Sequence, residues 1–233
     1  MPRAECTGSP FSGRPASRYD RPVNRHDPAL QDLMLLLLTG TLHLVFENLL
    51  HAKGPFLAAA AVVWAAWIVR RRRHQPRLLS AWGLCDPGDA AAWGRAVGLT
   101  LLSAVGLVVL RPSGGPALPA HAAAVCLLYL PWALVQQVAL QGILLRGLER
   151  LVPAPRAVAG AALLFAAAHL PDLRLGVLTA GAALAWTVLF RLRRSIWPLA
   201  VSHAVLGTLT YVVVLGRDPW QALAAALRAV GWP

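Results

Sequence analysis

Charged side chains are scarce in this chain of 233 residues, and acidic ones are the scarcest. Only 14% of the residues are charged, with 10 Asp and Glu against 22 Lys and Arg. Soluble domains carry about 25% charged residues. Because 57% of the residues are hydrophobic and lie in long runs, the composition excludes an ordinary soluble domain and indicates a membrane protein.

Cysteine is also sparse, with three residues that form no C-x-x-C pair and have no histidine at zinc-finger spacing. This count argues against a disulfide framework and against a structural zinc module. The net charge of +12 is typical of nucleic-acid-binding chains, but the apolar runs are too long and too frequent for that class. No glycine-rich phosphate loop follows a strand-like segment, and the sequence names no cofactor.

Three zones differ in composition. Residues 1–29 are rich in proline and arginine and cannot bury a core, so they are predicted to form a disordered basic tail. Residues 30–215 are predicted to form an all-α, multi-pass transmembrane helical bundle of about seven spans. Residues 216–233 are predicted to be a tail on the outer membrane face, with a short eighth crossing over 219–230 as the alternative. The seven apolar segments lie at 30–50, 55–69, 90–110, 119–145, 157–171, 175–190 and 195–215.

The basic residues are distributed unevenly over the two sides of this predicted topology. With loops assigned alternately, sixteen of the 22 basic residues lie on the side of the N-terminus and five on the other, while Arg95 lies inside a segment. Because loops rich in Arg and Lys stay in the cytoplasm, the split predicts a cytoplasmic N-terminus. Arginine so far in excess of lysine is typical of GC-rich bacteria, so we expect a bacterial cytoplasmic membrane protein surrounded by membrane lipids.

Strongly polar side chains inside a span are costly, and by default they indicate function. The fourth segment carries Gln136, Gln137 and Gln141 within six residues, and the last two share a helical face. At about 1.5 Å per residue, Gln136, His169 and His203 lie on three helices at about 12–18 Å from the predicted cytoplasmic side. Glutamines also join transmembrane helices by hydrogen bonds, and lone histidines are often packing residues. The shared depth favours a common site.

Other intramembrane polar groups have simpler interpretations. Three lie near segment ends, where side chains reach water: Asp32, Arg95 and His121. Three more follow an i, i+4, i+8 spacing and line one helical stripe: His43, Glu47 and His51. That spacing would suit a metal, but a hydrated outer helix end explains it more simply.

Three motifs follow one another over about residues 119–210. Gln136-Gln137-x-x-x-Gln141 is followed by Phe165-x-x-x-His169 and then by His203-x-x-x-Gly207. Their order and spacing resemble the CPBP family of intramembrane proteases, also called the CAAX-protease and bacteriocin-processing (Abi) family. The family pattern is Glu-Glu-x-x-x-Arg, then Phe-x-x-x-His, then His-x-x-x-Asn or Asp. The second motif matches fully, the first has lost its charges, and the third keeps only its histidine.

The resemblance implies a division of chemical labour. In the family the first glutamate is taken as the general base, helped by the histidine of the second motif, while the later histidine and asparagine stabilise the oxyanion. Gln136 and Gln137 have no ionisable proton, so neither can act as a base. The exchange of arginine for Gln141 is coherent with this loss, since a buried arginine without acidic partners is costly.

Two functions are therefore kept open. The first is a CPBP-type endopeptidase that cleaves peptide bonds of membrane-associated or lipidated peptides, with either His169 or Glu47 as the base. The second is a non-catalytic pseudoprotease that binds hydrophobic peptides, as an immunity or chaperone-like factor. A small transporter is disfavoured because no inverted repeat is visible. Neither hypothesis includes a metal or a nucleic acid. The candidate catalytic residues are His169, His203, Gln136 and Gln137, and the candidate pocket residues are Gln141, Phe165 and Gly207.

Overall fold

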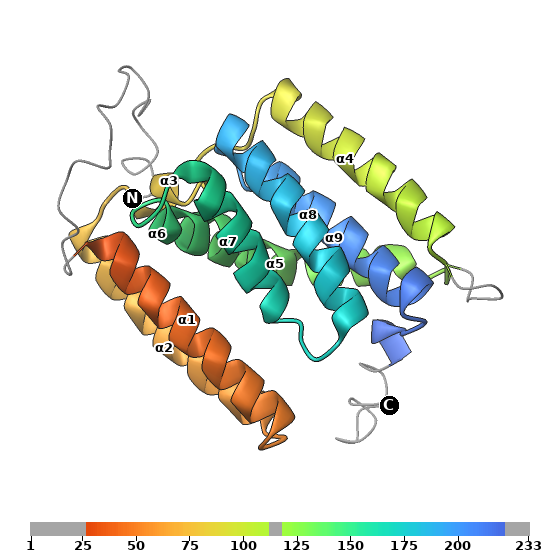
Figure 1. Cartoon of the computed structure of the whole chain (residues 1–233), viewed down its shortest axis with the longest axis horizontal. Coiled ribbons are helices and arrows are strands. Elements are labelled where there is room, and N and C mark those ends of the chain that lie inside the picture. Colours follow the sequence, from red (N-terminus) through yellow and green to blue (C-terminus); the bar gives the residue numbers. More distant parts are fainter. Residues whose placement is uncertain (1–26, 112–117, 222–233) are drawn as a thin grey trace. The chain divides into compact units, whose positions relative to one another are not determined.

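The computed structural model describes residues 27–111 and 118–221, and every regular element in those ranges is helical (Figure 1). The longest elements of the first half are α1 (Pro28–Asn48), α2 (Lys53–His74) and α4 (Ala90–Val109), with the short α3 (Leu78–Ala81) between them. One continuous helix follows, composed of α5 (Ala122–Gln137), the π-helix η3 (Val138–Leu145) and α6 (Arg146–Leu148). The remaining elements are α7 (Ala154–Ala167), α8 (Leu173–Leu192), α9 (Trp197–Leu209) and the π-helix η4 (Thr210–Val214).

Six of these helical stretches are long and apolar enough to cross a membrane, which confirms the multi-pass helical bundle. Each of the seven predicted segments coincides with a helix, but the fifth is shorter than expected. Helix α7 has 14 residues, and at 1.5 Å per residue it spans about 21 Å against a hydrocarbon thickness of about 30 Å. The predicted tail at 1–29 and the interfacial helix at 219–230 lie almost entirely outside the described residues.

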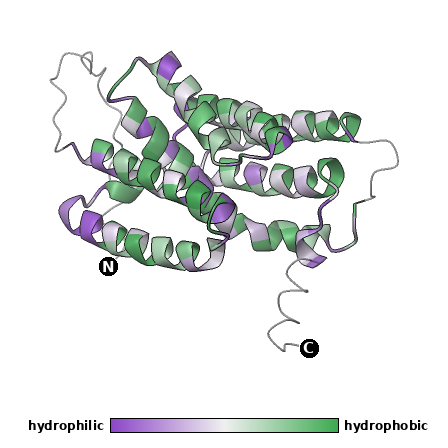
Figure 2. Ribbon diagram, turned by 60° about the horizontal axis from the view of Figure 1, so that its bottom comes forward, coloured by the Kyte–Doolittle hydropathy of each residue, from purple (hydrophilic) through white to green (hydrophobic). Residues whose placement is uncertain are grey.

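The outer faces of the helices are apolar. Figure 2 shows hydrophobic residues along the helices, and many large ones are exposed, such as Leu102 at 74%, Leu127 at 70% and Val177 at 72%. None of the hydrophobic window of α2 is buried inside the protein. In water such surfaces would be unfavourable, whereas in lipid they need no cover. The exposed apolar surface therefore supports a membrane environment independently of helix length.

Several of the scarce acidic residues begin helices. The Asp27 carboxylate accepts a hydrogen bond from Ala29 N at 2.8 Å, and Pro28 occupies the first turn of α1. Asp89 caps α4 through Ala92 N at 2.7 Å, and Asp172 caps α8 through Leu175 N at 3.1 Å. An aspartate at this position satisfies backbone N–H groups that have no helical partner. Three of the ten acidic residues thus define where spans start.

The chain forms two compact units. The first contains the described residues up to Pro87 together with Val138–Ile196, and the second contains Gly88–Gln137 together with the residues from Trp197 onward. In the first unit α1 packs beside α2 and against η3 and α6, and α7 packs against α8. In the second unit α9 packs against both α4 and α5. The Thr100 hydroxyl of α4 donates a hydrogen bond to Ser202 Oγ of α9 at 2.7 Å.

Within the first unit, η3 is held against α3 by a close approach of Trp82 to Gly142. A Cβ atom at position 142 would lie 2.9 Å from Trp82 Cγ, so a larger residue would displace the indole ring. Trp82, Leu78 and Ile143 form a buried hydrophobic cluster there. Cys85, three residues after Trp82, is disulfide-bonded, while Cys126 of the second unit is a free thiol.

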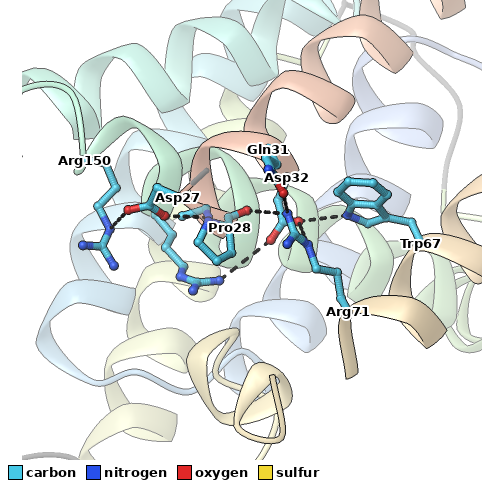
Figure 3. A network of polar contacts seen from close by, with 9 residues as sticks. Asp27, Pro28, Gln31, Asp32, Trp67, Arg71 and Arg150 are labelled. Carbon is cyan, nitrogen blue, oxygen red and sulfur yellow. Dashed lines mark hydrogen bonds and ion pairs between the residues drawn. The ribbon is translucent and has the colours of Figure 1, made fainter. Parts of the chain in front are cut away.

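A buried carboxylate joins α1 to α2 and α6 in the first unit (Figure 3). Asp32 Oδ1 accepts hydrogen bonds from Trp67 Nε1 and Arg71 Nε, both at 2.9 Å. Arg146 Nη1 lies 4.0 Å from the other carboxylate oxygen. The expectation that Asp32 reaches water is wrong, because its side chain is 1% exposed. Its partners come from helices far away in the sequence, which a position near a segment end does not reveal.

Candidate active site

The three glutamines lie where the helix changes its winding. Gln136 and Gln137 end α5, and Gln141 lies inside η3, whose hydrogen bonds run from i to i+5. Gln137 and Gln141, four residues apart, are slightly less than one turn of this wider helix from each other, so the π-helix does not separate them onto opposite faces. Both side chains are buried, at 0% and 1% exposure. Such π-helical turns occur frequently at functional sites.

In the second unit, α9 places His203 against α5. Gln137 Nε2 lies 3.3 Å from His203 Nδ1, and the Tyr129 hydroxyl lies 3.5 Å from His203 Nε2. The same hydroxyl donates a hydrogen bond to Gln136 Oε1 at 2.9 Å. The structure thus brings together Gln136, Gln137 and His203, three of the residues predicted from sequence, and it adds Tyr129, which the sequence analysis missed.

The direction of these hydrogen bonds can be worked out from the groups that form them. The Tyr129 O–H points to Gln136 Oε1, so the phenol oxygen is free to accept the Nε2–H of His203. His203 Nδ1 is then the unprotonated nitrogen, and the amide N–H of Gln137 donates to it. None of these three hydrogen bonds requires a charged group. A carboxylate at position 137 could only accept, and it would require the opposite histidine tautomer.

Gly207, which stands where the family has Asn or Asp, lies directly beneath Tyr129. A Cβ atom at this position would be 2.6 Å from Tyr129 Cε1, too close for any side chain while the ring stays in place. The ring of Tyr129 stands edge-on to His203, with centroids 5.9 Å apart and an interplanar angle of 82°. A signal for Tyr129 was present in the sequence, since it precedes Gln136 by seven residues and so lies on the same helical face.

In the first unit, His169 lies in the turn that follows α7 and is half-buried. Its Nδ1 is 3.0 Å from the carbonyl oxygen of Phe165. Because a carbonyl oxygen only accepts, Nδ1 carries the proton, and the neutral ring has its lone pair on Nε2. Phe165 is buried and its ring packs against the imidazole, with centroids 5.4 Å apart. In the second motif, Phe165 thus contacts His169 through both its ring and its backbone carbonyl group.

The stripe of His43, Glu47 and His51 ends earlier than its spacing suggested. His43 Nε2 lies 2.8 Å from Glu47 Oε2 on α1, within hydrogen-bond distance, whereas His51 lies beyond the end of that helix with φ of 51°. No group of three or more metal-ligating side chains occurs in residues 27–111 and 118–221. Glu47 is therefore the hydrogen-bond partner of His43, in the same unit as His169.

Comparison with known proteins adds one finding. Residues 116–209 match the family model described as "Type II CAAX prenyl endopeptidase Rce1-like". This range contains all three motifs, from Gln136 to Gly207. No curated protein and no solved structure matches the chain. The fold, the motif order and the family model agree, and over residues 116–209 the chain is similar to the CPBP, or CAAX-protease-like, family of membrane-embedded endopeptidases.

Proposed function

We propose that the chain is a CAAX-protease-like endopeptidase that cleaves membrane-associated or lipidated peptides with histidines in place of the family's glutamates. The observation that carries the proposal is the opposite protonation of the two motif histidines. His169 has its lone pair on Nε2 because Nδ1 donates to Phe165 O, whereas His203 has its proton on Nε2 because Nδ1 accepts from Gln137. One ring is thus arranged as a base and the other as a donor.

In this mechanism His169 Nε2 removes a proton from water as the water oxygen bonds to the peptide carbonyl carbon. The carbonyl oxygen takes the negative charge, whose stabilisation the family pattern assigns to the later histidine, here His203. When the C–N bond breaks, the proton on His169 passes to the leaving amine. Gln137 acts by fixing the tautomer of His203, for which an amide N–H suits better than a carboxylate. The loss of the glutamates is then compatible with hydrolysis.

Glu47 supports a second assignment of the base. Its Oε2 lies 2.8 Å from His43 Nε2, and a carboxylate–histidine pair is a common way to raise the basicity of an imidazole. If this pair is the base, replacing Glu47 by Gln should lower cleavage as much as replacing His169. If His169 is the base, cleavage should depend far less on Glu47.

The test uses the purified full chain in proteoliposomes with a prenylated peptide. We expect His169→Ala and His203→Ala each to lower the cleavage rate by about 100-fold or more, the usual contribution of an acid–base group. His51→Ala is the matched control, because this exposed histidine lies outside the helices, and it should leave the rate unchanged.

Two results would contradict the proposal. One is a wild-type chain that binds the peptide and cleaves none of it, which would favour the pseudoprotease alternative. The other is cleavage that persists undiminished in both histidine variants. Complementation in the native host by the double alanine variant would add to the case for a purely binding role.

A further inference from the structure

Tyr129 occupies the space that a side chain at position 207 would need. His203 and Gly207 are four residues apart on α9 and therefore share a face. The phenol ring covers this face, with Cε1 only 2.6 Å from an ideal Cβ at 207 and the ring edge-on to His203. Because Gly207 has no side chain, a bulky residue from α5 fits against α9 at this point.

The hydroxyl of Tyr129 determines which way the Gln136 amide faces. Its O–H donates to Gln136 Oε1 at 2.9 Å. Since the oxygen and nitrogen of a carbamoyl group lie on opposite sides of its carbon, fixing the oxygen on Tyr129 turns Nε2 away from the ring. Position 136 then presents two N–H donors, and it cannot take a proton. The nearby His203 Nε2 carries the other donor.

We propose that Tyr129 is a positioning residue of this site. It fills the volume of the missing side chain at 207, and it holds Gln136 so that Nε2 donates to a carbonyl oxygen of the bound peptide. The inference rests on the proposed function only in that a peptide binds beside His203. The site of the second unit is accordingly a donor site, built to bind oxygen acceptors.

The first experiment measures binding rather than cleavage. A hydrophobic peptide aldehyde, whose hydrate carries tetrahedral oxygens, is titrated against the purified full chain. We expect Tyr129→Phe to raise the dissociation constant by about 5–10-fold, which corresponds to the loss of one oriented hydrogen bond. Tyr211→Phe removes another phenol oxygen from the same unit, and it should leave the constant unchanged within about twofold.

A double variant separates positioning from mere packing. Gln136→Met keeps the size of the side chain and removes its donors, so it should weaken the probe about as much as Tyr129→Phe. If Tyr129 acts through Gln136, combining the two changes should add almost nothing, because the interaction is already lost. A structural role for Tyr129 would instead give independent effects that multiply.

Whether Tyr129 fills the space at position 207 is tested by asking whether Tyr129→Ala restores the stability of a Gly207→Asn variant. Gly207→Asn alone should lower the melting temperature, and Tyr129→Ala with Gly207→Asn should recover most of the loss, because the ring no longer fills the space. Three results would overturn the inference: no saturable binding to the wild-type chain, equal binding by Tyr129→Phe, or a Gly207→Asn variant as stable as wild type. A chain that binds the probe but cleaves no peptide would contradict the proposed function alone.

Discussion

The buried Asp32 network offers a sharp test of how the first unit is held together. Asp32 is 1% exposed and accepts hydrogen bonds from Trp67 and Arg71 at 2.9 Å, with Arg146 4.0 Å away. Replacing Asp32 by Ala leaves two guanidinium groups without their carboxylate. Removal of one partner from a buried pair costs about 3–5 kcal/mol. Arg71 keeps Pro28 O and Gln31 Oε1 as acceptors, so we expect the lower half of this range.

The assay is thermal unfolding of the detergent-solubilised chain, followed by fluorescence of its nine tryptophans. For 150–250 residues, 1 kcal/mol corresponds to about 2–4 °C, so Asp32→Ala should lower the melting temperature by about 6–16 °C. Asp32→Asn keeps an acceptor for Trp67 and should cost less. The control is Arg150→Ala, which removes an ion pair with Asp27 at 3.6 Å whose arginine is 39% exposed. Such a pair is worth about 0–1 kcal/mol.

The reasoning would be refuted if Asp32→Ala melted within the range of Arg150→Ala. That result would mean that the two arginines find other acceptors at no cost, and that the network does not secure α1 and α2 to α6. A larger loss for Asp32→Asn than for Asp32→Ala would also contradict it, because the amide keeps an oxygen that can accept a hydrogen bond.

Two further predictions concern the helix that carries the glutamines. Gly142→Ala should cost about 1–3 kcal/mol by overpacking, because a Cβ would lie 2.9 Å from Trp82. The control is Gly98→Ala, whose Cβ would have no atom within 4 Å, and it should leave the melting temperature unchanged or raise it in the same assay. Gln137→Leu should cost about 1–3 kcal/mol by leaving His203 Nδ1 without this buried donor. Gln137→Glu should change the tautomer of His203, which ¹⁵N NMR detects. An unchanged spectrum would contradict the donation from Gln137 to His203.

Much of the fold follows from the sequence because the membrane leaves few alternatives. In hydrocarbon every backbone polar group must find a hydrogen-bond partner within the protein, and a helix supplies all of these partners within one long apolar run. Aspartates such as Asp89 and Asp172 then define where those helices begin. The shortness of α7 was less visible, since apolar residues continue into the turn that carries His169. Segment length in the sequence is therefore an upper limit on helix length.

The sequence by itself determined the helical class, the membrane environment and the three motifs, because these depend on residue type and on spacing along one chain. Only the tertiary structure showed that Asp32 is buried and that Tyr129 fills the space above Gly207. It also showed the π-helix that contains Gln141. These features depend on contacts between helices that are distant in sequence, such as Asp32 with Arg71 and Tyr129 with His203. Periodicity within a single segment carries no information about such partners.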